Sequence, residues 1–461
     1  MTTTGQLTTD LTRSVHGPVY APGSDAYDAE RAGFQTAYAH RPALVVGAVD
    51  AADVAASVRF AAARGLPVAV QATGHGLTAA ADGGVLVTTA RMADVRIDPA
   101  TRTARVGAGA CWGQVVRAAA EHGLAPLNGS APHVGVVGYT LGGGIGPLGR
   151  SHGYAADHVR AVELVTADGR ARRVTGDTDP DLFWAVRGAG GNFGVVTALE
   201  FALFPVARLY GGGLYFPAER VPAVLAAYRE WTRELPEELS AGLGLIPYPD
   251  LPMVPEPLRG RYVAHLRVAG TVDRETGERL LAPMRALGPP LLDSLTEMPY
   301  SECASIYQDP PQPHPYHGTS ALLGELAAEL PGTVLDLAGP DSALPCVVQL
   351  NHLGGALGRP PSVPDAVGLR GAGHLLRVLA VAQAPDGAGP DPATEAPGRL
   401  TGALAPWTVG RSVNFLFGGY GDADRVRECY APGDYRRLAA LKAGYDPADL
   451  FRFTHHIPPA R

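Results

Sequence analysis

The histidine best placed to do chemistry in this sequence is enclosed by two glycines. Gly74-His75-Gly76 follows residues 67–71 (PVAVQ), whose composition predicts a strand, so the histidine lies where a strand ends. Because glycine has no Cβ, a ligand can approach the backbone closely on both sides of the ring. This placement predicts that His75 is a nucleophile or a cofactor ligand. The alternative is a turn histidine in solvent.

Two further segments are rich in glycine. Residues 135–146 (GVVGYTLGGGIG) can present successive N–H groups to a phosphate, or can form a tight turn beneath a packed helix. Residues 187–194 (RGAGGNFG) contain GxGxxF, close to the GxGxxG of dinucleotide-binding folds. This segment follows an expected helix rather than a strand, so it lacks the structural context of that fold.

The elements expected around these segments alternate in type. Asp50 is an N-cap and Gly65 a C-cap for a helix over 51–63, and Asp168-Gly169 is the turn of a hairpin over 161–175. Asp179-Pro180 opens a short helix ending at Arg187. The other expected elements are strands over 44–49, 67–71 and 195–204 and a helix over 112–121.

The pattern changes after Pro205. Strands are expected over 209–216, 241–247, 261–269, 345–350 and 374–382, and helices over 219–233, 275–287 and 319–330. This order predicts an antiparallel sheet with helices on one face. Residues 384–398 have the composition of a surface loop.

Composition narrows the class of protein. The chain has 461 residues, a net charge of −7 and 46% hydrophobic residues, which indicates a globular protein and argues against nucleic acid or an anionic membrane as partner. The four cysteines are widely spread and have no metal-ligand spacing, so no metal is expected. No membrane-length apolar run and no secretory signal are evident, so a cytoplasmic location is expected; the oligomeric state stays open.

Several motifs in order resemble one known family. They are Arg41-Pro42, GH at 74–75, GGGIG at 142–146, GYAADHV at 153–159, DLFWAVRGAGGNFGVVT at 181–197, YDPADLF at 445–451 and FTHHIPP at 453–459. The chain thereby resembles FAD-linked oxidases of the vanillyl-alcohol oxidase and p-cresol methylhydroxylase (PCMH) superfamily, within the berberine bridge enzyme-like group. The resemblance implies an α+β fold: a PCMH-type FAD-binding domain of two α+β subdomains over 1–205, a substrate-binding domain over 206–410, and a C-terminal segment over 411–461 that returns to the FAD domain.

The resemblance also implies how FAD is held. His75 matches the histidine that forms an 8α-histidyl bond to the flavin, and Asn414 matches an asparagine that reaches back to it. Val159 matches a position beside the reactive face, where a small aliphatic side chain goes with oxygen access. The other implied cofactor contacts are Thr73, Gly74, Gly76, Val134, Gly138, Tyr139, Gly142, Gly143, Gly144, Gly146, Gly190, Gly191, Asn192, Phe193, Gly194 and Val195.

Two positions depart from the family pattern. Ala131 stands where many relatives have a cysteine that forms a second flavin bond, so a single bond through His75 is expected. Ser412 replaces a tyrosine that often serves as base in sugar-oxidising relatives. Sugar oxidation is therefore disfavoured, and the base must come from elsewhere.

The substrate half supplies candidates for the remaining roles. Alternation along the strand places Gln349 and Asn351 on one face as possible substrate ligands. Tyr139, Tyr307 and His352 are candidate bases, and each has a structural alternative as a packed or hydrogen-bonded core residue.

The implied reaction is that of an oxidase. Hydride passes from a small-molecule substrate, expected to be a bulky intermediate of secondary metabolism such as antibiotic biosynthesis, to flavin N5, and O2 reoxidises the flavin to give H2O2. One alternative is a flavin-dependent oxygenase like that of enterocin biosynthesis. The other is a flavin-containing binding protein without turnover.

Overall fold

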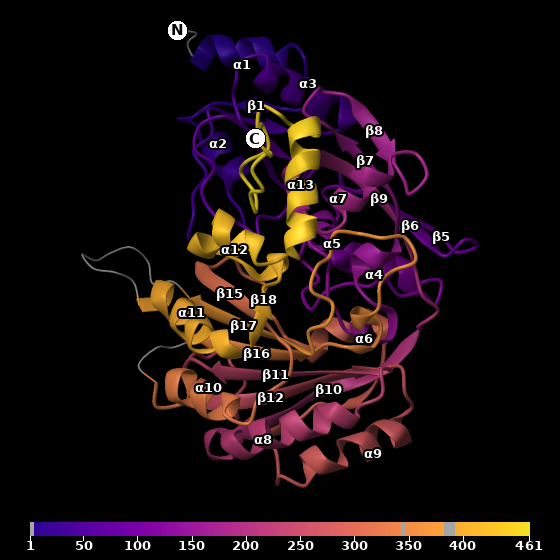
Figure 1. The fold of residues 1–461 in the computed structure, drawn as a ribbon, viewed down its shortest axis with the longest axis vertical. Coiled ribbons are helices and arrows are strands. Elements are labelled where there is room, and N and C mark those ends of the chain that lie inside the picture. Colours follow the sequence, from indigo (N-terminus) through magenta and orange to yellow (C-terminus); the bar gives the residue numbers. More distant parts are fainter. Residues whose placement is uncertain (1–3, 343–345, 382–391) are drawn as a thin grey trace.

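Three sheets organise the protein. The computed structural model describes residues 4–342, 346–381 and 392–461, and within them sheets of four, five and nine strands follow one another along the chain (Figure 1). The first two sheets lie in the upper half of the view and the third crosses the lower half. This is the expected α+β architecture.

The four-stranded sheet positions the Gly-His-Gly loop. Its order is β1 (Val19–Tyr20), β2 (Leu44–Gly47), β4 (Val85–Thr88), β3 (Val68–Gln71), and β2 and β3 both run parallel to β4. The α3 helix (Ala51–Ala62) connects β2 to β3, and the Asp50 side chain accepts from Asp53 N as its N-cap. Helices α1 (Thr4–Thr12) and α2 (Asp25–Arg31) complete this unit. His75 therefore follows the carboxyl end of a parallel strand, where ligand sites of such sheets lie.

The five-stranded sheet is antiparallel. Its order is β5 (Val95–Asp98), β6 (Thr103–Gly107), β9 (Val195–Ala202), β7 (Val159–Val165), β8 (Ala171–Val174), with Asp168-Gly169 in the expected β7–β8 turn. Four helices accompany it: α4 (Trp112–Ala120), α5 (Val136–Leu141), α6 (Gly149–His152) and α7 (Pro180–Val186). The side chains of Trp112, Phe183 and Phe193 are almost fully buried in its core.

The third sheet forms the substrate half. Its order is β13 (Leu292–Asp293), β10 (Arg208–Pro217), β12 (Tyr262–Gly270), β11 (Leu239–Pro247), β16 (Val347–His352), β17 (His374–Val381), β15 (Tyr316–Leu323), β18 (Thr408–Gly410), and β14 (Thr296–Pro299) pairs with β10. One face packs on helices α8 (Val221–Trp231), α9 (Arg274–Arg285), α10 (Leu330–Ala338) and α11 (Pro392–Ala403), as expected (Figure 1). The opposite face points toward the first half of the chain (Figure 1).

Two expected elements are wrong. Of the helix expected over 319–330, residues 319–323 belong to the strand β15, residues 324–329 form a connection, and the helix α10 begins only at Leu330. Every residue of β15 is buried, so the strand lacks the alternation that separates a strand from a helix in sequence. The loop expected over 384–398 falls partly outside the described residues, and from Pro392 onward it is helix α11.

The C-terminal segment returns to the first half of the chain. After β18 come α12 (Ala423–Arg427) and α13 (Pro432–Tyr445), and Figure 1 shows α13 (yellow) lying beside α7. Val68 N donates to Leu450 O, so the tail meets the strand that precedes the Gly-His-Gly loop. None of the helices in the described ranges has the length and apolar character needed to cross a membrane.

Candidate active site

The His75 ring is held by contacts on both sides and at one nitrogen. Phe34 stacks on it with ring centroids 3.9 Å apart and an interplanar angle of 14°. Nδ1 lies 2.8 Å from Thr73 Oγ1, while the buried Nε2 has no partner. The pKa of His75 is lowered to about 3, first by burial and then by His133 and His314. The ring is therefore neutral near pH 7, with one nitrogen available.

The loop around His75 also offers unused backbone donors. Within the described ranges no protein group accepts from the N–H groups of Gly74, His75 or Gly76. Gly74 has φ +71° and packs on Gly33, where an added Cβ would lie 2.6 Å from Gly33 Cα, so only glycine fits. Tyr316 on β15 donates from its hydroxyl to the His75 carbonyl (2.6 Å), which ties this loop to the third sheet. Consecutive free N–H groups form a concavity that suits an anion such as a phosphate.

Residues 142–146 form a tightly packed turn that also leaves donors free. A Cβ at Gly142 or Gly146 would lie 1.8 Å from Asn414 Oδ1 or Asn128 O respectively, and at Gly144 it would meet the Tyr139 ring at 2.4 Å. The carbonyls of Gly143 and Gly144 accept from Ala156 and Ala155. In the part of the chain that the structure covers, the N–H groups of residues 144–146 have no acceptor. Both interpretations of this segment, tight turn and anion cradle, are therefore compatible with its geometry.

The segment 187–194 is bound mainly into the protein. The buried Asn192 side chain donates to Ala189 O and His455 O and accepts from Ile457 N, so it holds the C-terminal tail. Phe193 and Val195 are fully buried, and Gly194 packs against Val165 O. Beside Gly190 and Gly191 an added Cβ would meet only Thr454, at 3.8 and 3.6 Å. Contact of this segment with FAD stays a prediction. The open space lies beside the backbone of Gly190 and Gly191, whereas the side chains of Asn192, Phe193 and Val195 are buried in the protein.

The remaining cofactor candidates flank the same region. Asn414 donates to Tyr139 O (2.8 Å) and so fastens the C-terminal segment to helix α5. Gly138 in α5 has open space where a Cβ would stand, Val134 is partly buried, and Val159 is buried at the start of β7. Ala131 is buried, and the carbonyl of Ser412 accepts a hydrogen bond from Ser320 Oγ.

The two tyrosine candidates are unsuited to accept a proton near neutral pH. Burial raises the pKa of Tyr139 well above 10, and its hydroxyl has no partner. Burial likewise raises the pKa of Tyr307, despite the Arg267 guanidinium 5.7 Å from its ring. Both are protonated in the resting protein, so each can donate a hydrogen bond but is not poised as a base.

His352 belongs to an arginine network instead of facing the His75 loop. Its Nε2 lies 2.9 Å from Arg150 Nη1, and its ring stacks on His374 with centroids 5.2 Å apart. Burial, Arg150 and His374 together lower its pKa to about 2. Arg150 also donates to carbonyls of Leu235, Leu239 and Leu353. His352 thus joins α6 to the third sheet, which is the structural alternative considered for it.

Gln349 and Asn351 share a face of β16, as the alternation along the strand predicts. In the sheet register Gln349 lies opposite Arg377 on β17 and opposite Gly244 on β11. Arg377 and Gln349 line one cavity with Thr319, Phe415 and Phe417. Four residues of the region were not predicted from the sequence: Phe34 and His314 beside His75, and Arg267 and Arg377 on the third sheet. An arginine inside an otherwise apolar strand, as in HLLRVLAV, was the available signal for the last two.

This site has the features of an FAD pocket, and the comparisons agree. Residues 42–175 match the family model described as "FAD binding domain", and residues 413–458 match "Berberine and berberine like". The chain is 32% identical to (R)-6-hydroxynicotine oxidase of Paenarthrobacter nicotinovorans over 97% of both chains. It is 27% identical to an FAD-linked oxidoreductase of Dictyostelium discoideum over 98% of this chain and 97% of the relative.

Solved structures give the same result. The 6-hydroxy-D-nicotine oxidase of Arthrobacter nicotinovorans superposes with a TM-score of 0.84 at 29% identity, covering 97% of this chain and 99% of that one. A glucooligosaccharide oxidase of Acremonium strictum that carries 6-S-cysteinyl, 8α-N1-histidyl FAD has a TM-score of 0.85 at 21% identity, covering 98% and 99%. The chain therefore belongs to the berberine bridge enzyme-like FAD oxidases with a PCMH-type fold. It is an FAD-dependent oxidoreductase, and the alternative of a binding protein without turnover is set aside.

Proposed function

We propose that this oxidase carries FAD covalently attached to His75 and passes electrons from a small-molecule substrate to O2, giving H2O2. The observation that supports the attachment is the buried, unpartnered Nε2 of a neutral imidazole. A neutral ring nitrogen is the form that can act as a nucleophile. When bound, the flavin accepts hydride from the substrate and returns electrons to O2.

The roles of the protein residues follow from their contacts. Attachment through Nε2 requires the ring proton on Nδ1, where Thr73 Oγ1 can accept it at 2.8 Å. Phe34 stacks on the ring and fixes its plane. The free N–H groups of residues 74–76 and 144–146 can donate hydrogen bonds to the negatively charged pyrophosphate. Buried side chains around the site exclude water, which strengthens these interactions.

The test is whether flavin survives denaturation. Acid-precipitated wild-type protein should stay yellow and exceed the apoprotein mass by one FAD, with the modification on His75 in a tryptic map. His75→Ala should release its flavin. His133→Ala is the matched control, because its ring lies 5.0 Å from His75, and it should retain the flavin. Flavin on another residue would overturn the assignment.

The oxidase output is tested separately. A substrate should bleach the flavin under anaerobic conditions, and admission of O2 should restore the colour with one H2O2 formed for each substrate consumed. Oxygen incorporated into the product without H2O2 would contradict the oxidase proposal and favour an oxygenase.

A further inference from the structure

Two arginines on the third sheet, Arg267 (buried) and Arg377 (partly buried), use few of their guanidinium donors within the protein. Arg267 on β12 is 6% exposed, and burial lowers the pKa of Arg377 on β17 to about 10. In the described chain neither forms an ion pair with a carboxylate. Arg267 donates from Nε to His265 Nδ1 (3.1 Å), and Arg377 makes no hydrogen bond there but lies 3.9 Å from the Phe415 ring centre.

Three other arginines of the protein have most of their guanidinium donors satisfied by carbonyls or carboxylates. Arg187 donates to the carbonyls of Phe183, Ala156, Val363 and Pro364. Arg150 donates to several carbonyls in the same way, and Arg370 pairs with two aspartates. A buried charge without a partner is unfavourable. The spare donors of Arg267 and Arg377 are not among the sealed, unpartnered atoms of the described residues, so they remain open to a ligand.

Arg377 is paired with Gln349 in the sheet, and the Arg267 side chain reaches Gly244, which is paired with Gln349 on its other side. The Arg267 guanidinium leans over Gly244, where an added Cβ would lie 3.4 Å from Nη2. Glycine at position 244 thus leaves room for Arg267 to reach toward Arg377 across two intervening strands.

This place lies on the face of the third sheet that meets the His75 loop. Arg377 and Gln349 line a cavity with Phe415 and Phe417, which follow Asn414 in the segment bound to α5. Tyr316, on the neighbouring strand β15, donates to the His75 carbonyl. The carboxylate of Asp309 raises the pKa of Arg377, but it accepts from Ser130 Oγ and is not in ion-pair contact with either arginine.

We infer that the substrate is a carboxylate-bearing molecule whose carboxylate is held by Arg267 and Arg377, with Gln349 beside it; this rests on the proposed function of the site. The planar guanidinium fork fits the two oxygens of a carboxylate. Phe415, Phe417 and Tyr307 supply an aromatic wall for the body of the same molecule. The arginines are specificity residues, since they bind the group that orients the substrate toward the flavin.

The experiment compares benzoate with its uncharged analogue benzamide on the holoenzyme, by calorimetry and by the shift of the flavin absorption bands. Benzoate should bind and perturb the bands, and benzamide should bind about tenfold or more weakly, as expected for hydrogen bonds to a charged group. Arg377→Met and Arg267→Met should each weaken benzoate to a similar extent without changing benzamide. Arg279→Met, at an exposed site on α9, should change neither.

The possible results separate the explanations. Equal binding of benzoate and benzamide by the wild-type protein, which needs no variant, overturns the proposal. Unchanged benzoate binding in Arg377→Met together with a lowered flavin potential also overturns it, because the arginines would then serve the reduced flavin. Benzoate binding by calorimetry in a protein that retains no flavin supports the anion site and contradicts only the proposed function.

Discussion

At the scale of single residues, the contact between Thr73 and His75 is the one that can set the tautomer of the ring. Thr73 Oγ1 lies 2.8 Å from Nδ1 and is the only side-chain partner of this ring nitrogen among the described residues. Removing it leaves the tautomer and the ring orientation to Phe34 stacking alone. We expect Thr73→Val to bind FAD but to attach it slowly, so that the fraction of flavin retained after acid precipitation falls several-fold.

Thr73→Ser is the control for this prediction. Serine keeps the hydroxyl and loses the methyl group, whereas valine keeps the methyl group and loses the hydroxyl. Normal attachment in Thr73→Ser with slow attachment in Thr73→Val would therefore assign the effect to the hydroxyl. The measurement is the ratio of protein-bound to released flavin as a function of incubation time with FAD. Wild-type rates in Thr73→Val would show that Thr73 does not position His75.

Residues whose surroundings are set by their neighbours in the chain could be predicted from the sequence, and residues whose surroundings are set by distant segments could not. His75 was recognisable because its neighbours in the chain, Gly74 and Gly76, define its environment. Arg267 and Arg377 were missed because their common location depends on the pairing of β12, β11, β16 and β17. Tyr139 was assigned a possible catalytic role, but its buried hydroxyl depends on tertiary packing, such as the contact of its ring with Trp112 at a centroid distance of 5.3 Å.

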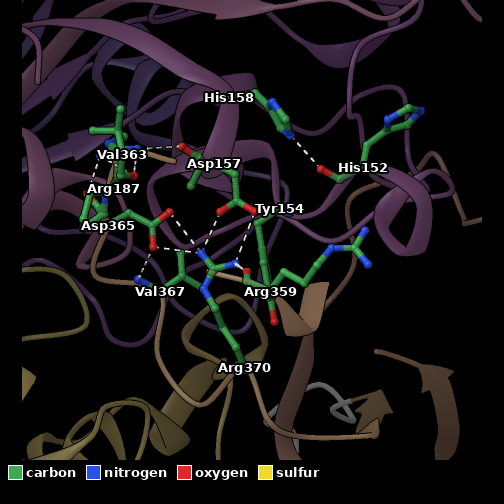
Figure 2. A network of polar contacts seen from close by, with 12 residues as sticks. His152, Tyr154, Asp157, His158, Arg187, Arg359, Val363, Asp365, Val367 and Arg370 are labelled. Atoms are coloured by element: carbon green, nitrogen blue, oxygen red, sulfur yellow. Dashed lines mark hydrogen bonds and ion pairs between the residues drawn. The ribbon is translucent and has the colours of Figure 1, made fainter. Parts of the chain in front are cut away.

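At the scale of elements, one ion-pair network joins the two halves of the chain. Arg370 donates to Asp157, in the GYAADHV segment, and to Asp365, in the connection between β16 and β17 (Figure 2). Both carboxylates are nearly inaccessible, with side-chain exposures of 7% and 1%. Two buried carboxylates thus share one cation. Ionisation of both is unfavourable, which favours the protonated form of one of them.

The unfavourable ionisation of this buried carboxyl predicts a pH dependence of stability. Burial raises the pKa of Asp365 to about 7, against its attraction to Arg370 and with repulsion from Asp157. A raised folded-state pKa means that the folded protein binds more protons than the unfolded chain between about pH 4 and 7. The contribution of Asp365 to stability is therefore present below this window and is lost as pH rises through it.

Asp365→Asn removes the titration and keeps an acceptor for Val367 N. Relative to wild type, the variant should gain about 1–2 °C in melting temperature between pH 5 and pH 8. Asp25→Asn, at an exposed helix start, should track the wild type across the same range. A constant difference between Asp365→Asn and wild type at all pH values would contradict the assigned titration.

Elements with local signals were predictable and those defined by tertiary contacts were not. The α3 cap, the β7–β8 hairpin and the α7 start depend on Asp50, Asp168-Gly169 and Asp179-Pro180, which act within a few residues. The helix expected over 319–330 includes the end of strand β15, because every residue of this strand is buried and its sequence shows no alternation. Its identity is decided by pairing with β17 and β18 rather than by its own sequence.

At the scale of the whole molecule, the resemblance supplied what local patterns did not. The α+β class came from motifs far apart in the chain, and the structure agrees with it. The C-terminal helix α13 contacts α7 in the first half of the chain. The assignment of 1–205, 206–410 and 411–461 as separate domains stays a prediction. Contacts such as Asn414 to Tyr139 and Tyr316 to His75 show that the site is completed by segments from all three ranges.

The return of the C-terminal segment depends on Lys442, the only lysine of the chain. Its fully buried ammonium pairs with Asp446 (2.7 Å) and donates to the carbonyls of Asn192 and Phe451. Asp446 also accepts from Leu450 N and Phe451 N. Helix α13, the 187–194 segment and the tail are thereby fixed to one another around a single buried charge pair.

Lys442→Met should therefore destabilise the protein by about 3–5 kcal/mol, because it leaves Asp446 buried without its counter-charge. Thermal or denaturant unfolding of the holoenzyme measures the loss. Arg437→Met is the matched control on the same helix: its pair with Asp181 is about half exposed on both sides, so its loss should cost about 1 kcal/mol or less. Adding Asp446→Asn to Lys442→Met should recover part of the stability, since the remaining amide carries no charge. Equal losses in Lys442→Met and Arg437→Met would show that the buried pair does not hold the C-terminal segment in place.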